Sequence, residues 1–276
     1  MGKIGFSMEI FPPKVDAGIE AIYAPLADLS KLSPDYISVT FSAGGSAVGL
    51  TDDVCAYIQN EYNIPAVAHL TCAGSSKEFI NNYLDNLQNK KITRILALRG
   101  DLAEDKTLSD YVYATDLIKD AVNHGGFDIF AACYPEGYKE SLSFEHDIEV
   151  MKLKEDAGAT HFISQLFFDE KDFLKMRDQA RKIGVKSEIS AGIMPVTNAR
   201  QIVRMVQLSG ARIPKKLAKL IARYEHDPAG LVDAGIEYAV QLSLRLASEG
   251  VDALHLYAMN NADVANKYYR GIASVL

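Results

Sequence analysis

Eight short runs of apolar or β-branched residues recur along the chain, and they constrain its fold more than any other feature of the sequence. The stretches between them carry apolar residues spaced by threes and fours, as at Phe173, Met176, Ala180 and Ile183, which is the helical period. Strands that alternate with helices pair in parallel through right-handed crossovers. Eight such units within about 250 residues predict a closed (β/α)8 barrel, the TIM-barrel fold of the α/β class. The runs cover residues 5–10, 36–41, 66–70, 94–98, 128–132, 161–166, 188–193 and 253–257.

The number of units also bears on domain organisation. A chain of 276 residues can form one large domain or two smaller ones. Eight units spread along the whole length favour a single domain over residues 1–276. The interval 195–252 is long enough to hold an extra helix, at about 214–224, besides the usual one between the seventh and eighth strands. An open doubly wound sheet is the alternative, but no G-x-G-x-x-G motif follows the first run.

Helix starts can be recognised from capping residues. Asp227 precedes a proline, a pattern typical of a helix whose first position is Pro228. Ser76 and Asp169 stand before two other helical patterns, where a short polar side chain can accept a hydrogen bond from a free backbone amide. These positions agree with the strand–helix alternation.

Charge and cysteine content exclude several classes of protein. The chain has 29 basic and 36 acidic residues, a net charge of −7, and no basic run that could follow a phosphate backbone, which argues against nucleic-acid binding. No apolar stretch approaches the ~20 residues of a membrane span, so we expect a cytoplasmic protein. Cys55, Cys72 and Cys133 form no C-x-x-C pair, which fits neither a disulfide framework nor a cysteine-based zinc site, and we predict no metal.

Motifs for several other chemistries are missing. Residues 44–49 have the glycine spacing of a P-loop but continue with Leu50-Thr51 instead of Lys-Ser or Lys-Thr. Neither H-E-x-x-H nor G-x-S-x-G occurs in the chain. Kinase-like, zincin and α/β-hydrolase functions are therefore disfavoured.

Polar residues stand near the carboxyl end of almost every predicted strand. In a (β/α)8 barrel this is where active sites are built, whereas polar groups elsewhere in the strands are costly to bury. The strand ends therefore predict the site. They carry Glu9, Thr40, His69, Thr71, Arg99, Asp101, Tyr134, Glu136, Gln165, Asp169, Tyr257 and Asn260.

Glu9 and His69 are two of the residues in this set that can donate or accept protons. Glu9 lies in an apolar run, a setting that favours the neutral carboxyl and suits a general acid near neutral pH. A salt-bridged structural carboxylate explains the same pattern about equally well. His69 is a candidate ligand contact, although a lone histidine among apolar residues is more often a hydrogen-bonded core residue.

Two further strand ends carry groups suited to binding. Arg99-Gly100-Asp101 combines a cation with a glycine that lets backbone amides approach a ligand. An ordinary strand–helix turn that holds an Arg–Asp pair would have the same sequence pattern. The amide of Gln165 can orient a heterocycle or simply hold a neighbouring loop. Each pattern alone leaves both interpretations open.

Taken together, seven short motifs resemble those of methylenetetrahydrofolate reductase, in the same order and across almost the whole chain. The resemblance implies a TIM-barrel flavoprotein of one-carbon metabolism and methionine biosynthesis. Such an enzyme reduces 5,10-methylenetetrahydrofolate to 5-methyltetrahydrofolate with NADH or NADPH, through bound FAD in a ping-pong cycle. The motifs are SMEIFPPK at 7–14, SVTF at 38–41, HLTC at 69–72, ALRGD at 97–101, AACYPE at 131–136, QLFFD at 165–169 and GIMPV at 192–196.

The resemblance also implies roles for individual residues. Glu9 corresponds to the family's general acid and Asp101 to a carboxylate near both flavin and pterin, so both are expected to be catalytic and to contact substrate. Gln165 and Gln201 match folate-contacting positions. The FAD-binding residues implied in this way are Thr40, Phe41, Ala43, His69, Arg99, Gly100, Asp101, Ala114, Tyr134, Tyr138, Asp147 and Lys154.

Four positions depart from the family's pattern. Tyr138 stands where a histidine is frequent and Val150 where an asparagine is frequent, both beside the flavin. Met205 replaces a ligand-stacking aromatic, and Asn261 replaces an arginine that usually contacts folate, so neither stacking nor a charge-assisted bond can form there.

Other functions remain open beside a self-sufficient reductase. One is a flavin- and folate-binding subunit that needs a partner protein for electron input, and another is a barrel enzyme without flavin, such as a pterin-dependent methyltransferase. For the reductase we expect a homo-oligomer with a small-molecule folate substrate. The sequence leaves open whether electrons come from NADH, NADPH or a protein.

Overall fold

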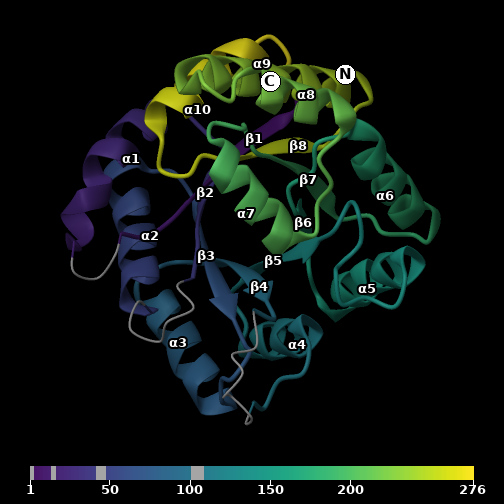
Figure 1. Ribbon diagram of the computed structural model, residues 1–276. Helices are drawn as coiled ribbons and strands as arrows, with labels where there is room; N and C mark the ends of the chain where they lie inside the picture. The colour runs from purple at the N-terminus through teal and green to yellow at the C-terminus, as the bar shows by residue number, and fades with distance from the viewer. Residues whose placement is uncertain (1–2, 14–16, 42–47, 101–108) are drawn as a thin grey trace. The chain divides into compact units, whose positions relative to one another are not determined.

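Eight parallel strands form a closed barrel in sequential order, β1 to β8, in the computed structural model (Figure 1). The structure describes residues 3–13, 17–41, 48–100 and 109–276. This order confirms the predicted TIM barrel. The strands are β1 Gly5–Ile10, β2 Tyr36–Val39, β3 Ala66–Thr71, β4 Arg94–Leu98, β5 Asp128–Cys133, β6 His161–Ser164, β7 Glu188–Ile193 and β8 Ala253–Tyr257.

Helices follow the strands, and two of them lie between β7 and α9. The second of these, α8, spans Lys215–Arg223 and confirms the extra helix expected at 214–224. The described α-helices are α1 Tyr23–Leu29, α2 Val48–Tyr62, α3 Lys77–Asn89, α4 Ala114–His124, α5 Phe144–Ala157, α6 Glu170–Lys182, α7 Ala199–Ser209, α8, α9 Pro228–Ser248 and α10 Ala262–Ile272, with short 3₁₀ turns η2 Ile19–Ile22 and η3 Ser30–Leu32.

Two strands end before the apolar runs that predicted them. β2 ends at Val39 although the run continues to residue 41, and β6 ends at Ser164 although its run continues to 166. In the second case the backbone amide of Leu166 donates to the side-chain oxygen of Gln165, 2.9 Å away, instead of to a neighbouring strand. The chain thus leaves the sheet where its polar residues begin.

The predicted helix caps are present. The side chains of Ser76, Asp169 and Asp227 accept hydrogen bonds from backbone amides in the first turns of α3, α6 and α9. Each satisfies an amide that has no partner within its own helix. Cys55, Cys72 and Cys133 are all buried, and none of these three forms a disulfide.

Backbone contacts group the chain into two compact units. One comprises Met1–Phe6, Cys133–Lys152 and Ile163–Leu276, and the other comprises Ser7–Ala132 and Leu153–Phe162. The organisation as one domain over residues 1–276 remains a prediction.

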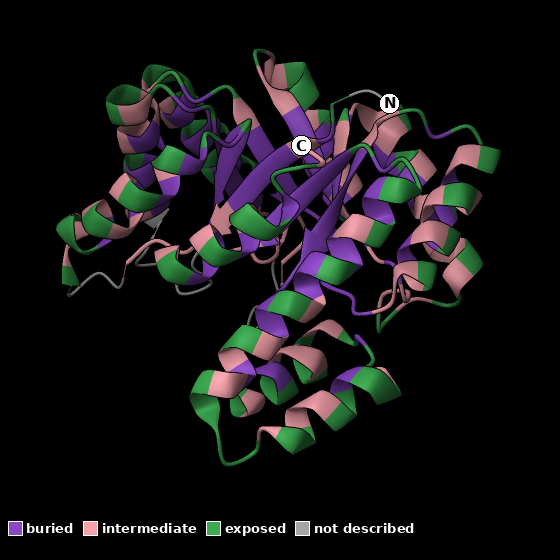
Figure 2. Ribbon diagram, turned by 90° about the horizontal axis from the view of Figure 1, so that it is seen from above, coloured by how far each residue is buried: buried purple, intermediate pink, exposed green. Residues whose placement is uncertain are grey.

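Burial explains why the strands read as almost continuous apolar runs. Strand residues are mostly buried, while the helices alternate between buried and exposed positions (Figure 2). A parallel sheet covered on both faces needs apolar side chains on both. In the second unit the strand core includes Ile37, Val67 and Ala97, and α3 packs inward through Ile80 and Leu84.

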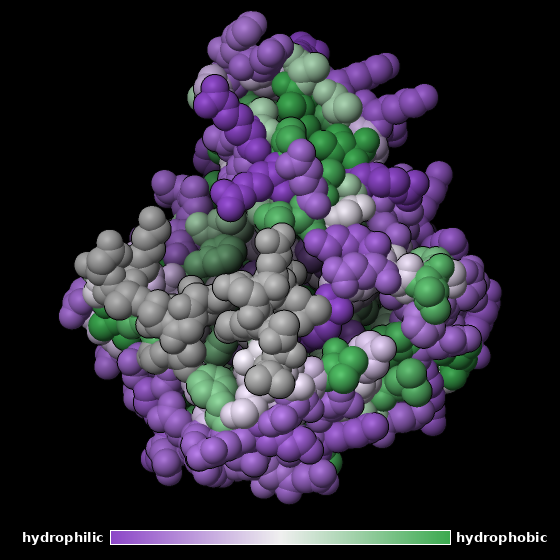
Figure 3. All heavy atoms as spheres, turned by 60° about the horizontal axis from the view of Figure 1, so that its bottom comes forward, coloured by the Kyte–Doolittle hydropathy of each residue, from purple (hydrophilic) through white to green (hydrophobic). Residues whose placement is uncertain are grey.

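The face of the molecule shown in Figure 3 is mainly hydrophilic among the residues that the structure describes. On the face shown in Figure 3, hydrophilic side chains surround small hydrophobic patches. Among the helices that the structure describes, none is long and apolar enough to cross a membrane.

Candidate active site

Glu9 and His69 lie beside each other at the ends of β1 and β3. Glu9 pairs in register with Ser38 of β2, which pairs with Val67 of β3, so Glu9, Ser38 and Val67 lie side by side across three strands. His69 stands two residues beyond Val67, on the same face of the sheet. Its Nε2 atom is 3.5 Å from Oε2 of Glu9, and only 7% of the histidine side chain and 12% of the glutamate side chain are exposed. The two polar side chains therefore lie close together in a largely dry setting.

The Arg99-Gly100 turn packs against the end of β3. The carbonyl oxygen of Arg99 accepts hydrogen bonds from the amides of Ala73, at 2.7 Å, and Cys72, at 3.2 Å. Gly100 has φ +82°, and a Cβ atom there would lie 2.9 Å from Cβ of Thr71. This position therefore requires glycine. The close approach of two backbone segments agrees with the role expected for Gly100 from the sequence.

Three other predicted flavin residues lie in the unit that comprises Ser7–Ala132 and Leu153–Phe162. The carbonyl oxygen of Thr40 accepts a 3.0 Å hydrogen bond from Oγ1 of Thr51, and the ring of Phe41 meets that of Tyr83 edge-on. Ala114 is the buried first residue of α4. The predicted residues Ala43 and Asp101 lie outside the described part of the chain.

Lys154 places a buried cation near the end of β5. It lies on α5 with only 7% of the residue exposed, and Nζ donates a 2.7 Å hydrogen bond to the carbonyl oxygen of Ala132. A buried ammonium group is costly unless it meets acceptors or an anion. This setting suits a residue that contacts an anionic ligand.

Tyr134, Tyr138 and Asp147 gather around the turn that follows β5. The backbone amide of Tyr138 donates a 2.7 Å hydrogen bond to Oδ2 of Asp147. The ring centroids of Tyr134 and Tyr138 lie 4.8 Å apart. Gly137 makes the turn with φ +86°. The structure thus brings these three predicted flavin residues together.

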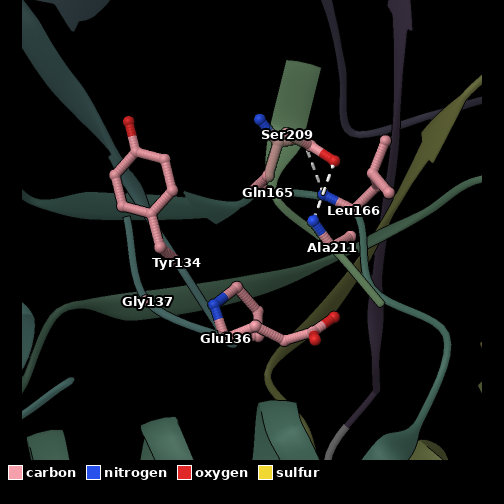
Figure 4. Close-up of a pocket in the computed structure, with 8 residues that line it drawn as sticks. Tyr134, Glu136, Gly137, Gln165, Leu166, Ser209 and Ala211 are labelled. Atoms are coloured by element: carbon pink, nitrogen blue, oxygen red, sulfur yellow. Dashed lines mark hydrogen bonds between the residues drawn. The ribbon is translucent and has the colours of Figure 1, made fainter. Parts of the chain in front are cut away.

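A small pocket, open to solvent, lies beside this turn (Figure 4). Gln165, a predicted folate residue, lines it together with Tyr134, and its side-chain oxygen is held by the amide of Leu166. Gln201, the other predicted folate residue, lies in the first turn of α7 and is not part of the lining. The lining residues are Tyr134, Pro135, Glu136, Gly137, Gln165, Leu166, Ser209 and Ala211.

Two clusters near this pocket were not predicted. The Tyr257 hydroxyl donates a 2.6 Å hydrogen bond to the carbonyl oxygen of Ser164, and a Cβ atom at Gly192 would lie 2.3 Å from that same oxygen. Arg212 pairs with the carboxylates of Glu136 and Asp172. Glu136 and Tyr257 stand among the polar strand ends, but no local pattern connects either residue with a partner so far away in sequence.

A comparison with known protein families identifies the family to which this sequence is related. A sequence model of the family described as Methylenetetrahydrofolate reductase matches residues 1–272. The chain belongs to this family. The match covers nearly the whole barrel and confirms the resemblance seen in the seven motifs.

Individual proteins similar to this chain carry the name of the same family. The chain is 33% identical over 264 residues to 5,10-methylenetetrahydrofolate reductase of Pectobacterium carotovorum subsp. carotovorum, a match that covers 96% of this chain and 88% of the relative. It is 31% identical to the enzyme of the same name from Escherichia coli K12, with 96% and 89% covered. Methylenetetrahydrofolate reductase (NADH) 1 of Arabidopsis thaliana is also 31% identical, but the chain spans only 46% of that longer relative.

A solved structure supports the fold. An uncharacterized protein from Clostridium thermocellum that binds two copies of 5-methyl-5,6,7,8-tetrahydrofolic acid superposes with a TM-score of 0.72, covering 99% of this chain and 95% of that one. The two sequences are 10% identical, so the likeness concerns the fold alone.

Two departures from the family's pattern have structural roles here. The side chain of Asn261 caps α10 by accepting a 3.1 Å hydrogen bond from the amide of Val264. Met205 packs against the apolar cluster beneath α7 and α8, which includes Leu166 and Ile202. Nothing in the structure explains Val150.

Proposed function

We propose that this protein reduces 5,10-methylenetetrahydrofolate to 5-methyltetrahydrofolate with electrons from NADH or NADPH, using FAD in a ping-pong cycle. The observation that carries the proposal is the largely buried Glu9–His69 pair near the strand ends, where a barrel builds its active site. Membership of the family supports the same reaction. We place the activity in the cytoplasm, in a homo-oligomer that serves one-carbon metabolism and methionine biosynthesis.

The described residues fit an FAD molecule. Lys154 offers a buried cation to an anionic cofactor, and Gly100 offers a backbone without a side chain. Bound FAD would supply hydride transfer between the nicotinamide and the folate. The other residues that would hold it are Thr40, Phe41, Ala43, His69, Arg99, Asp101, Ala114, Tyr134, Tyr138 and Asp147.

Glu9 would act as the general acid. The reduction adds one hydride and one proton to the folate, and the proton is needed on the nitrogen that departs when the bridging methylene group opens. Glu9 would deliver it there, with His69 beside the carboxyl as the neighbouring polar group. Asp101, with Glu9, would contact the substrate and tune the pterin by its charge.

Gln165 and Gln201 would orient the folate. The side-chain oxygen of Gln165 accepts from Leu166, which fixes the amide plane and leaves the NH2 group as the donor for a pterin acceptor. Gln201, in the first turn of α7, would contact the substrate from that helix.

Anaerobic spectroscopy of the purified protein tests the proposal. We expect a yellow protein with flavin absorption that is bleached by NADH or NADPH and recoloured by 5,10-methylenetetrahydrofolate. A colourless preparation that does not bind added FAD would overturn it. Folate binding by such a preparation would point instead to a flavin-free barrel enzyme of the methyltransferase type.

The same experiment addresses the source of electrons. Flavin that binds but stays oxidised with both nicotinamides would indicate a component that receives electrons from a partner subunit. Reduction by one nicotinamide at a much lower concentration than by the other would identify the donor.

A further inference from the structure

Glu136 is a buried carboxylate at the edge of the candidate pocket. It follows Tyr134 in the β5–α5 loop and lines the pocket, and its side chain is only 7% exposed. A carboxylate in such a position needs strong hydrogen-bond donors, because losing water is costly for a charged group. Its donors therefore decide how this edge of the pocket is held.

Arg212 supplies these donors. Its backbone amide lies 3.1 Å from both oxygens of the Glu136 carboxylate, and its Nε atom lies 2.6 Å from Oε2. Its Nη2 atom donates to Oδ1 of Asp172, in the first turn of α6, at 2.7 Å. One arginine thus joins the loop after β5 to the helix after β6.

The charges of this cluster are coupled. Burial, followed by the negative charge of Glu136, raises the pKa of Asp172, while Arg212 opposes the increase. The hydrogen bond to Glu136 raises the pKa of Arg212 itself. Without the arginine, two nearby carboxylates would face each other with little water around Glu136.

Arg212 lies in the short segment 210–214 that connects α7 with α8. The helix α7 ends at Ser209, and Gly210 adopts the left-handed conformation with φ +76°. Ile202 is the only fully buried residue of α7, while Val203 and Leu208 are more than half exposed. Ala199, Met205 and Val206 also pack, partly buried, against the apolar cluster around Ile202, so the ion pairs of Arg212 add a polar attachment to a modest apolar one.

The helix attached in this way carries groups of the proposed site. Gln201 stands in its first turn, and Ser209 at its end lines the pocket together with Ala211. A displacement of α7 would therefore move a proposed folate contact and one wall of the pocket together.

We propose that Arg212 is a positioning residue for folate reduction: it fastens the end of α7 to Glu136 and Asp172 and so holds Gln201 and the pocket wall in place for the substrate. This inference rests on the proposed function. Arg212 need not touch the substrate, and its effect is exerted through α7.

The test compares Arg212→Ala and Arg212→Lys with the control Arg223→Ala, which removes an exposed arginine at the end of α8. Because small misplacements of substrate contacts are costly, we expect Arg212→Ala to raise the KM for 5,10-methylenetetrahydrofolate about tenfold and to change flavin reduction by NADH less than about twofold. Arg212→Lys should recover part of the loss, because it keeps the charge without the forked geometry. Arg223→Ala should behave like the unmodified protein.

A double variant separates positioning from simple charge compensation. Arg212→Ala should also lower the unfolding temperature, because the Glu136 carboxylate loses its cationic partner. Combining it with Glu136→Gln removes the uncompensated charge and should recover that temperature. The KM should stay high, because α7 is still unfastened. Recovery of both quantities would overturn the positioning role, as would an unchanged KM in Arg212→Ala.

Hydrogen exchange tests the attachment independently of the reaction. The amides of residues 199–211 should exchange faster in Arg212→Ala than in Arg223→Ala, and equal exchange would contradict the inference. If the unmodified protein binds neither flavin nor folate, the proposed function fails, and this measurement still decides whether Arg212 holds α7.

Discussion

The Nε2 atom of His69 lies 3.5 Å from Oε2 of Glu9, with β2 between the two strands that carry them. Both side chains are largely buried, with 7% of the histidine and 12% of the glutamate exposed. A pair that only stabilises the barrel is needed equally in every step of a reaction. A general acid is needed only in the step that protonates the folate, and this difference makes its role measurable.

Lys154→Met should weaken FAD binding without unfolding the protein. Methionine has a similar length and suits a buried site, whereas the cation that would meet the anionic cofactor is lost. We expect the dissociation constant for FAD to rise about tenfold, measured by flavin fluorescence. Lys182→Met, at an exposed position of α6, serves as the control and should retain affinity. Equal affinities in the two variants would remove Lys154 from the FAD site.

Gly192→Ala should destabilise the fold through steric conflict. The added Cβ atom would lie 2.3 Å from the carbonyl oxygen of Ser164 and 2.8 Å from Cε2 of Tyr257. The hydroxyl group of Tyr257 donates a hydrogen bond to the same carbonyl oxygen, so neither neighbour can move away without breaking that bond. We expect a loss of about 3 kcal/mol in the free energy of unfolding, measured with urea.

Gly125→Ala provides the comparison for this substitution. Gly125 has φ +84° and ψ 164°, a conformation essentially restricted to glycine, and nothing lies within 4 Å of its added Cβ atom, so only backbone strain of about 1–2 kcal/mol is expected. Equal losses at the two positions would argue against crowding as the cause at Gly192.

Asn261→Ala should destabilise the protein by about 1 kcal/mol, because the cap on the amide of Val264 is lost. Asn261→Asp retains an acceptor oxygen and should keep the stability of the unmodified protein. Thermal unfolding of both variants measures the difference. If aspartate costs as much as alanine, the side chain does not act as a helix cap.

Asp128 should make stability depend on acid pH. Its hydrogen bond with His161, followed by those with Thr160 and the charges of His161 and Arg94, lowers its pKa below the ordinary value of 3.8 although burial opposes this. Because the folded-state pKa is lowered, the stabilisation is complete above the unfolded-state value and is lost as pH falls through the folded-state value. Asp128→Asn should therefore reduce stability at neutral pH and lose less on acidification.

Urea unfolding between about pH 6 and pH 2 measures this dependence. Glu225→Gln, at an exposed position, should keep the pH dependence of the unmodified protein. Parallel curves for Asp128→Asn and the unmodified protein would contradict the assignment.

Much of the fold could be predicted because its strands are buried on both faces and therefore appear as uninterrupted apolar runs. The polar residues at the ends of these runs indicated Glu9, His69 and Gln165 as candidate site residues, and these assignments remain predictions. Arg212 could not be found in this way, because its partners Glu136 and Asp172 lie 76 and 40 residues away in sequence. Asn261 could be recognised as a departure from the family's pattern, but its capping role depends on where α10 begins.

The most direct test of the central claim is to measure the two half-reactions anaerobically in Glu9→Gln beside the control Glu78→Gln, an exposed glutamate of α3. Glutamine keeps the size of the side chain but cannot deliver the proton, so Glu9→Gln should retain flavin reduction by the nicotinamide. It should slow flavin reoxidation by 5,10-methylenetetrahydrofolate at least about a hundredfold. Equal slowing of both half-reactions, or reoxidation at the unmodified rate, would contradict the assignment of Glu9 as the general acid.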